Sequence, residues 1–206
     1  HDVYGPVIYG DEFIYWRNMK ALFASQGPLN SGYPPFYSFL MGLGGLWPDT
    51  YRGVLLVNIL AGCILPFTAW RLSRSCSGCC RIGAVVLVST LPVLLIYPRL
   101  MMSENLFLPL LGLALWAFWT ASSDSSPWSA FLAGVILLLA CMTRYQGVFF
   151  AVGAVMALLM AGLWEKWFGP DRTAANQALK RWVLKAVVIG GVPAAGILLW
   201  KWLGIP

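Results

Sequence analysis

Long apolar stretches recur along most of the chain and are separated by short polar links. A helix needs about 20 mostly apolar residues to cross the hydrocarbon core of a bilayer, which is about 30 Å thick. Six stretches approach this length, and we expect a transmembrane helix in each. They lie near 53–71, 82–98, 104–121, 128–143, 147–164 and 182–200. The pattern predicts an all-α fold, a polytopic transmembrane helical bundle.

The beginning of the chain is more polar and more aromatic than the rest. Adjacent acids, Asp11 and Glu12, precede an amphipathic aromatic stretch that runs to Phe23. Acidic residues favour a helix N-terminus, so we expect a short helix that begins at Asp11 or Glu12.

Two consecutive prolines mark the next element. Pro34 and Pro35 favour an extended backbone and block a helix before position 35. The residues that follow, 36–47, are apolar but too few to span a bilayer, and they predict a re-entrant or interfacial helix. We therefore divide the chain into a juxtamembrane helical loop, 1–50, and a six-helix transmembrane part, 51–206.

The composition agrees with a membrane protein. Hydrophobic residues make up 59% of the chain and charged residues only 11%, whereas a soluble domain has about 25% charged residues. The abundance of apolar and aromatic residues excludes a disordered chain. Five cysteines in 206 residues are too few for a disulfide scaffold.

The distribution of Lys and Arg predicts the orientation in the membrane. Six crossings place the links alternately on two faces; one face collects eight Lys or Arg and three acids, the other six and five. By the positive-inside rule the first face is cytoplasmic. The segment 1–50 is then a short external juxtamembrane helical loop, and Arg99 and Arg144 also lie outside the cytoplasm. Topology accounts for the net charge of +6, so a nucleic-acid partner is not indicated.

The start of the chain bears on its completeness. The chain opens at His1 without the pattern of a signal peptide. An external N-terminal segment needs an earlier helix to deliver it, so we expect a fragment of a larger protein with a further transmembrane helix upstream.

Charged groups on the external face are the candidates for chemistry. Asp11 and Glu12 can remove a proton from a hydroxyl, or they can simply cap an interfacial helix. Arg99 and Arg144 interrupt apolar sequence. Their guanidinium groups suit bidentate binding of a lipid phosphate, although a charge at a membrane boundary can also extend to water without any ligand. We expect the acids and the two arginines to converge on one pocket at the outer leaflet.

These residues resemble the polytopic glycosyltransferases of the C superfamily, such as the protein mannosyltransferases and aminoarabinose transferases. The resemblance covers nearly the whole chain, and each of its motifs falls on the face assigned as external. The motifs are Asp11-Glu12, Tyr33-Pro34-Pro35-Phe36-Tyr37, Met102-Ser103-Glu104-Asn105-Leu106-Phe107 and Thr143-Arg144-Tyr145-Gln146-Gly147. The chain departs from the family at Tyr145, where Pro often follows the Arg, and at Gln146, which replaces an acid. The subfamily is therefore left open.

The resemblance implies an inverting transfer from a polyprenyl-phosphate sugar to a hydroxyl of a glycan, lipid or protein acceptor, at the extracytoplasmic face. Asp11 would accept the proton of that hydroxyl, and Glu12 would orient the acceptor or share this role. Arg99 and Arg144 would bind the donor phosphate. Glu104 would shape the pocket or assist a divalent cation. The other implied pocket residues are Tyr33, Tyr37, Tyr145 and Gln146.

A transporter or flippase for lipid-linked or small polar substrates is the main alternative, because broken helices and membrane charges serve both classes. Transporters typically hold functional charge near the bilayer midplane. Here the candidate charges lie at helix ends on one face, and this position favours surface chemistry.

The cytoplasmic links show no metal site. Cys76-x-x-Cys79-Cys80 lacks a second cysteine pair, so we expect reduced or lipidated thiols. The chain has one His, and a zinc site built from histidines is not supported. Cys63 and Cys141 are expected to pack in the core. The segment 164–182 predicts a cytoplasmic loop with a surface helix.

Overall fold

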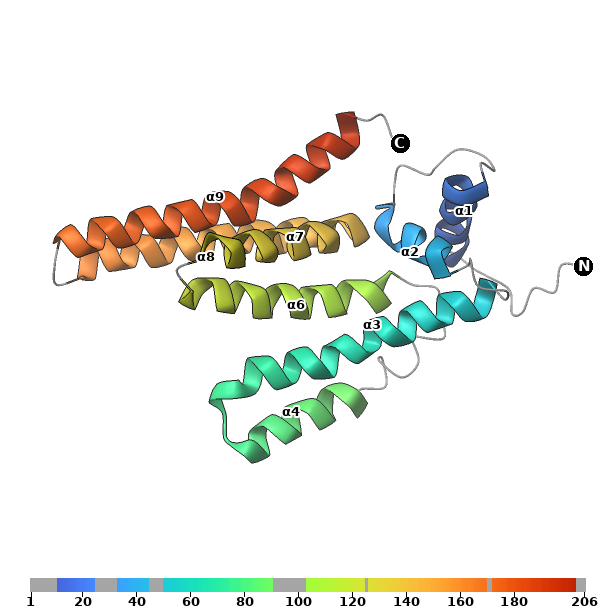
Figure 1. The fold of residues 1–206 in the computed structure, drawn as a ribbon, viewed down its shortest axis with the longest axis horizontal. Helices are drawn as coiled ribbons and strands as arrows, with labels where there is room; N and C mark the ends of the chain where they lie inside the picture. The colour runs from blue at the N-terminus through green and yellow to red at the C-terminus, as the bar shows by residue number, and fades with distance from the viewer. Residues whose placement is uncertain are drawn as a thin grey trace, which may run out of the picture. The chain divides into compact units, whose positions relative to one another are not determined.

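The computed structural model describes residues 11–24, 33–44, 50–90, 103–124, 126–169 and 172–202, with side chains except at 11–12, 24 and 50–54. Across these ranges the chain is helical and has no strand (Figure 1). The predicted all-α fold is therefore confirmed. The helices are α1 (Asp11–Ala24), α2 (Phe36–Gly44), α3 (Thr50–Leu72), the 3-10 helix η1 (Ser73–Ser75), α4 (Gly78–Thr90), α6 (Glu104–Ser123), α7 (Pro127–Thr143), α8 (Gln146–Phe168) and α9 (Arg172–Trp202).

The described helices overlap the predicted spans. Four are long and apolar enough to cross a bilayer, at Leu55–Ser75, Glu104–Ser123, Gln146–Phe168 and Arg172–Trp202. Shorter apolar helices occupy Gly78–Thr90 and Pro127–Thr143. The second predicted span continues to residue 98, and its part beyond Thr90 lies outside the described residues.

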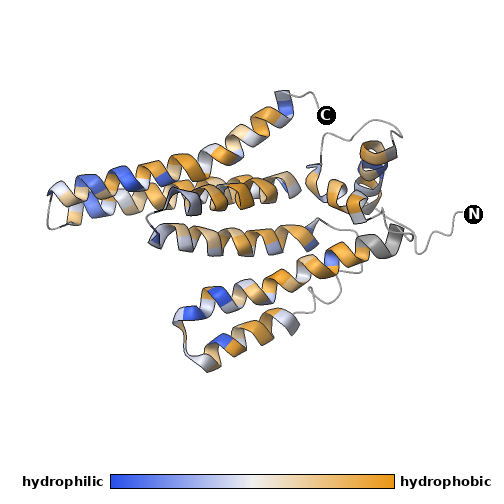
Figure 2. Cartoon of the chain, in the orientation of Figure 1, coloured by the Kyte–Doolittle hydropathy of each residue, from blue (hydrophilic) through white to orange (hydrophobic). Residues whose placement is uncertain are grey.

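The outer surfaces of these helices are apolar, as a lipid solvent requires. Apolar residues colour most of the length of α3, α6, α7 and α8 in Figure 2. Large side chains such as Phe149, Trp167 and Leu198 are exposed at 78%, 72% and 66%. A soluble protein rarely presents contiguous apolar surface of this extent, whereas a transmembrane bundle presents it to acyl chains.

The chain forms two compact units, which meet within α6 at Pro109. Unit 1, His1–Pro109 with Ile205–Pro206, contains α1 to α4 and the first turns of α6. Within it, α2 packs against both α1 and α3, and α3 forms a hairpin with α4. Unit 2, Leu110–Gly204, contains the rest of α6 with α7, α8 and α9.

Small residues allow the helices of unit 2 to pack closely. Its buried core is rich in alanine, with Leu137, Leu158 and Ile189 as larger members. A side-chain carbon at Gly134 would lie 3.2 Å from a carbonyl oxygen of α9, and one at Gly190 would lie 2.6 Å from a valine of α8. Van der Waals packing of this kind drives helix association in membranes, where the hydrophobic effect is absent.

A lysine connects α9 to the end of α6. The Lys185 ammonium donates to the carbonyl oxygens of Ser122, at 3.3 Å, and Asp124, at 2.7 Å. Ser122 lies in the last turn of α6 and Asp124 directly after it, where a cation satisfies otherwise unpaired acceptors. The next helix starts at once, because Ser126 caps α7 by accepting the Trp128 amide at 3.3 Å.

Two sequence predictions need correction. The segment 164–182 is not a loop with a separate surface helix: α8 continues to Phe168, and α9 begins at Arg172 and runs unbroken through the last predicted span. Cys63 was expected in the core, but its side chain is exposed, whereas Cys141 is buried as expected. In a lipid solvent, apolar residues need no burial within the protein.

Candidate functional site

Helix α1 begins at Asp11, as the acid pair predicts. Its buried face consists of Tyr15, Asn18 and Met19, which are exposed at 3%, 1% and 6%. The spacing i, i+3 and i+4 places these three side chains on one side of the helix. Asp11 and Glu12 occupy the first turn of α1, one turn before Tyr15; their side chains lie outside the described part.

Three tyrosines form an aromatic cluster around α1, in which Tyr15 and Tyr37 are buried and Tyr33 is partly exposed. The ring of Tyr15 packs edge to face against Tyr33, with centroids 5.4 Å apart, and against Tyr37 at 5.0 Å. Tyr37 is fully buried, and its hydroxyl donates to the side-chain oxygen of Asn58 in α3 at 3.0 Å. Two of the three predicted pocket tyrosines, Tyr33 and Tyr37, therefore pack against the same ring, that of Tyr15.

The start of α6 contacts the same cluster. The Tyr15 hydroxyl donates to the Ser103 hydroxyl at 2.7 Å. Ser103 is fully buried, and its carbonyl accepts the amides of Leu106 at 3.1 Å and Phe107 at 2.8 Å, which begins the helix. Glu104 follows directly as the first residue of α6. Tyr15 thus joins parts of two sequence motifs, at 33–37 and 102–107, and it lies in the helix that the acid pair begins.

The fourth motif forms the turn between α7 and α8. The Arg144 Nε donates to the side-chain oxygen of Gln146 at 3.1 Å, so the amide orients the guanidinium group. The Gly147 amide donates to the Arg144 carbonyl at 2.9 Å, and this bond tightens the turn. Tyr145 is 56% exposed. A side-chain carbon at Gly147 would lie 2.6 Å from the amide nitrogen of Cys141, so the two backbones meet here.

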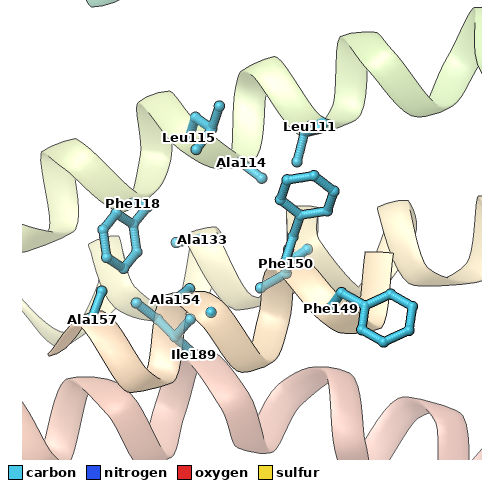
Figure 3. Close-up of a pocket in the computed structure, with 12 residues that line it drawn as sticks. Leu111, Ala114, Leu115, Phe118, Ala133, Phe149, Phe150, Ala154, Ala157 and Ile189 are labelled. Carbon is cyan, nitrogen blue, oxygen red and sulfur yellow. The ribbon is translucent and has the colours of Figure 1, made fainter. Parts of the chain in front are cut away.

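An apolar cavity lies within unit 2, between α6, α7 and α8 (Figure 3). Its volume is about 270 Å³. In Figure 3 the rings of Phe118 and Phe150 stand on either side of the small side chains of Ala114 and Ala133. The lining residues are Leu111, Ala114, Leu115, Phe118, Ala133, Leu137, Phe149, Phe150, Gly153, Ala154, Ala157 and Ile189. All are apolar residues, so the cavity suits a hydrocarbon chain.

The predicted convergence of acids and arginines stays a prediction. Arg99 lies outside the described residues, and so do the side chains of Asp11 and Glu12. Arg144 belongs to unit 2, while Asp11 and Glu104 belong to unit 1. Among the residues with described side chains, no three His, Cys, Asp or Glu lie close enough together to hold a metal ion. Cys76, Cys79 and Cys80 are exposed free thiols.

Sequence reasoning missed two features of these sites. Tyr15 and Asn58 were not predicted as partners of the pocket tyrosines, although each is a polar residue with apolar neighbours on both sides in the sequence. The cavity was also missed. Its sequence signal is the pair Phe149-Phe150 followed closely by Gly153 and Ala154, which places large rings beside small side chains on α8.

Comparison with known proteins identifies a relationship. The family model described as dolichyl-phosphate-mannose-protein mannosyltransferase matches residues 33–174, which is more than half of the chain. The match includes three of the four motifs, at 33–37, 102–107 and 143–147. No curated protein and no solved structure matches the chain.

Proposed function

The chain belongs to the dolichyl-phosphate-mannose-protein mannosyltransferase family and is therefore a membrane glycosyltransferase of the C superfamily, and we propose that its donor is a polyprenyl-phosphate sugar. The sugar is transferred, with inversion at the anomeric carbon, to a hydroxyl of a glycan, lipid or protein acceptor. The reaction takes place at the extracytoplasmic surface of the membrane.

The apolar cavity beside the Arg144 turn is the observation that best supports this donor. Phe149 and Phe150 line the cavity from the first two turns of α8, and Arg144 immediately precedes that helix. Arg144 lies two residues before α8, and Phe150 lies four residues, or about 6 Å, along that helix from Gln146, so the cation and the apolar site are close in the chain. A polyprenyl phosphate has the matching chemistry, an anionic head joined to a hydrocarbon chain.

Arg144 binds the phosphate of the donor. Its Nε is oriented by Gln146 at 3.1 Å, which fixes the direction of the planar guanidinium fork. Arginine forms paired, charge-assisted hydrogen bonds with phosphate and stays charged at any physiological pH. As the sugar leaves, negative charge grows on the phosphate, and a fixed cation stabilises that charge without reorganising. Arg99 supplies a second cation.

Asp11 is the general base. The acceptor oxygen attacks the anomeric carbon, the bond from that carbon to the phosphate oxygen breaks, and the acceptor proton passes to the Asp11 carboxylate. The polyprenyl phosphate departs without protonation by an acid. Glu12 orients the acceptor or shares the role of base. Glu104, at the start of α6, shapes the pocket or assists a divalent cation, and Tyr33, Tyr37 and Tyr145 complete the pocket.

The ends of α8 support the external location. Arg144 precedes this 23-residue helix, and Lys166 lies in its last turn. A helix of this length spans about 34 Å, slightly more than the bilayer core, so the two cations lie at opposite membrane surfaces. Lys166 is accompanied by Arg172, Lys180 and Arg181. The positive-inside rule assigns this more basic surface to the cytoplasm and Arg144 to the other side.

Transfer by an Asp11→Asn variant tests the proposal. The complete protein is reconstituted in vesicles with a panel of polyprenyl-phosphate sugars, mannose first. We expect Asp11→Asn to abolish transfer while membrane insertion stays normal, because an amide cannot accept the proton. Glu165→Gln, which neutralises an acid at the predicted cytoplasmic end of α8, is the matched control and should transfer at the normal rate. Normal transfer by Asp11→Asn would disprove the base assignment.

A further inference from the structure

The Tyr15 side chain is fixed at both its ring and its hydroxyl. The ring packs edge to face against Tyr33 and Tyr37, which restrains rotation about its axis. The hydroxyl donates to Ser103 at 2.7 Å, and both side chains are buried, at 3% and 0% exposure. A buried hydrogen bond between residues 88 positions apart joins two elements that the chain itself does not hold together.

Helix α1 depends on such contacts for its position. It has only 14 residues, and isolated helices of about this length are marginal in water. Its position must therefore come from packing on neighbouring elements. Tyr15 lies one turn after Asp11 in the same helix, so contacts that fix Tyr15 also restrain the backbone of the first turn.

The partner of Tyr15 is equally well fixed. The Ser103 carbonyl accepts two amides of α6, from Leu106 and Phe107, so Ser103 is tied to the first turn of a 20-residue helix. The hydrogen bond from Tyr15 therefore anchors the short helix α1 to the start of the long, apolar helix α6. Both residues belong to unit 1, and the contact lies entirely within it.

We propose that Tyr15 is a positioning residue for sugar transfer: its hydrogen bond to Ser103 ties α1 to the N-terminus of α6 and so keeps Asp11, in the first turn of α1, in place. This role rests on the proposed function, because it assigns Tyr15 to the positioning of the general base. Tyr15 acts through Asp11 and does not itself exchange a proton with the acceptor.

Removal of the two hydroxyls, separately and together, tests the role. Tyr15→Phe keeps the ring and removes the hydroxyl that donates to Ser103, and Ser103→Ala removes the acceptor of the same bond. A displacement of about 1 Å can reduce turnover about a hundredfold, so we expect kcat to fall by about tenfold to a hundredfold in each variant. The KM for the donor should change less than about twofold, because this contact positions the base and not the donor.

The double variant and a rescue variant separate positioning from general damage. Tyr15→Phe combined with Ser103→Ala should be no slower than either single variant, because both remove one shared bond. Ser103→Thr retains the hydroxyl and should restore kcat. Thr68→Val is the matched control: Thr68 is 2% exposed and donates to the Leu65 carbonyl at 2.9 Å within α3, so this variant loses a buried hydroxyl without changing α1.

Three results would overturn the role: a normal kcat in Tyr15→Phe, multiplicative losses in the double variant, or an equal loss in Thr68→Val. The test also separates this inference from the proposed function. A fully active Tyr15→Phe beside an inactive Asp11→Asn rejects only the positioning role. A fully active Asp11→Asn rejects the base assignment, and the positioning role with it.

Discussion

An alanine at position 147 should disturb the turn that presents Arg144. A side-chain carbon there would lie 2.6 Å from the amide nitrogen of Cys141 and 2.7 Å from its Cα. Ordinary contacts begin at 3.4 Å, so raising 2.6 Å to that value requires the backbones of α7 and α8 to separate by about 0.8 Å. Because both partners are backbone atoms, no side chain can rotate to relieve the overlap.

The energetic cost follows from the same geometry. Overpacking a close contact costs about 1 to 3 kcal/mol, and replacing a helical glycine by alanine returns up to about 1 kcal/mol. We expect Gly147→Ala to lose about 1 to 2 kcal/mol of stability, which lowers Tm by roughly 2 to 8 °C for a protein of this size. The displaced turn moves Arg144 by a similar 0.8 Å, and kcat/KM for the donor should fall about tenfold.

The assay compares Gly147→Ala with Gly191→Ala. A side-chain carbon at Gly191, in the middle of α9, would meet nothing within 4 Å, so this variant makes the same chemical change without a clash. Thermal unfolding in detergent and transfer in vesicles are measured for both. Equal Tm and equal kcat/KM in the two variants would refute the reasoning that the α7 to α8 turn requires a glycine.

Two further predictions concern the donor. Arg144→Ala should raise the KM for the donor about tenfold or more, and Gln146→Ala about threefold to tenfold, because charged hydrogen bonds contribute more than neutral ones; an unchanged KM in Arg144→Ala removes this residue from the phosphate site. Gly153→Leu fills the cavity without a backbone clash and should impair long-chain donors more than short-chain ones, whereas Gly191→Leu should not. Equal use of both chain lengths by Gly153→Leu would exclude the cavity as the site of the lipid chain.

The helices could be predicted because the bilayer dictates their length. Because the hydrocarbon core has a nearly fixed thickness, the length of an apolar stretch shows whether it can cross the membrane as a helix. Each of the six predicted stretches overlaps a helix. The ends of several helices could also be predicted from nearby residues. Asp11 begins α1, the prolines before Phe36 delay α2, and Gly169 ends α8. Each of these signals acts within a few residues of its position in the chain.

Burial and long-range partners could not be predicted in the same way. In water, an apolar residue such as Cys63 indicates a core position, but lipid accepts apolar side chains on the outside as well. Polar composition near Lys180 indicated a surface helix but gave no sign that it continues into the last span. The bond from Tyr15 to Ser103 joins residues 88 positions apart, and no local pattern encodes such a pairing.

The two hydrogen bonds of Lys185 have a mechanical consequence for the bundle. Small side chains line the interface of α9 with its neighbouring helices. Such an interface resists separation of the helices better than it resists sliding of one helix along another. Lys185 donates to the carbonyls of Ser122 and Asp124, so an axial shift of α9 by a single residue, about 1.5 Å, would break both hydrogen bonds. A single lysine thus fixes the axial position of α9, the longest of the described helices, relative to the end of α6.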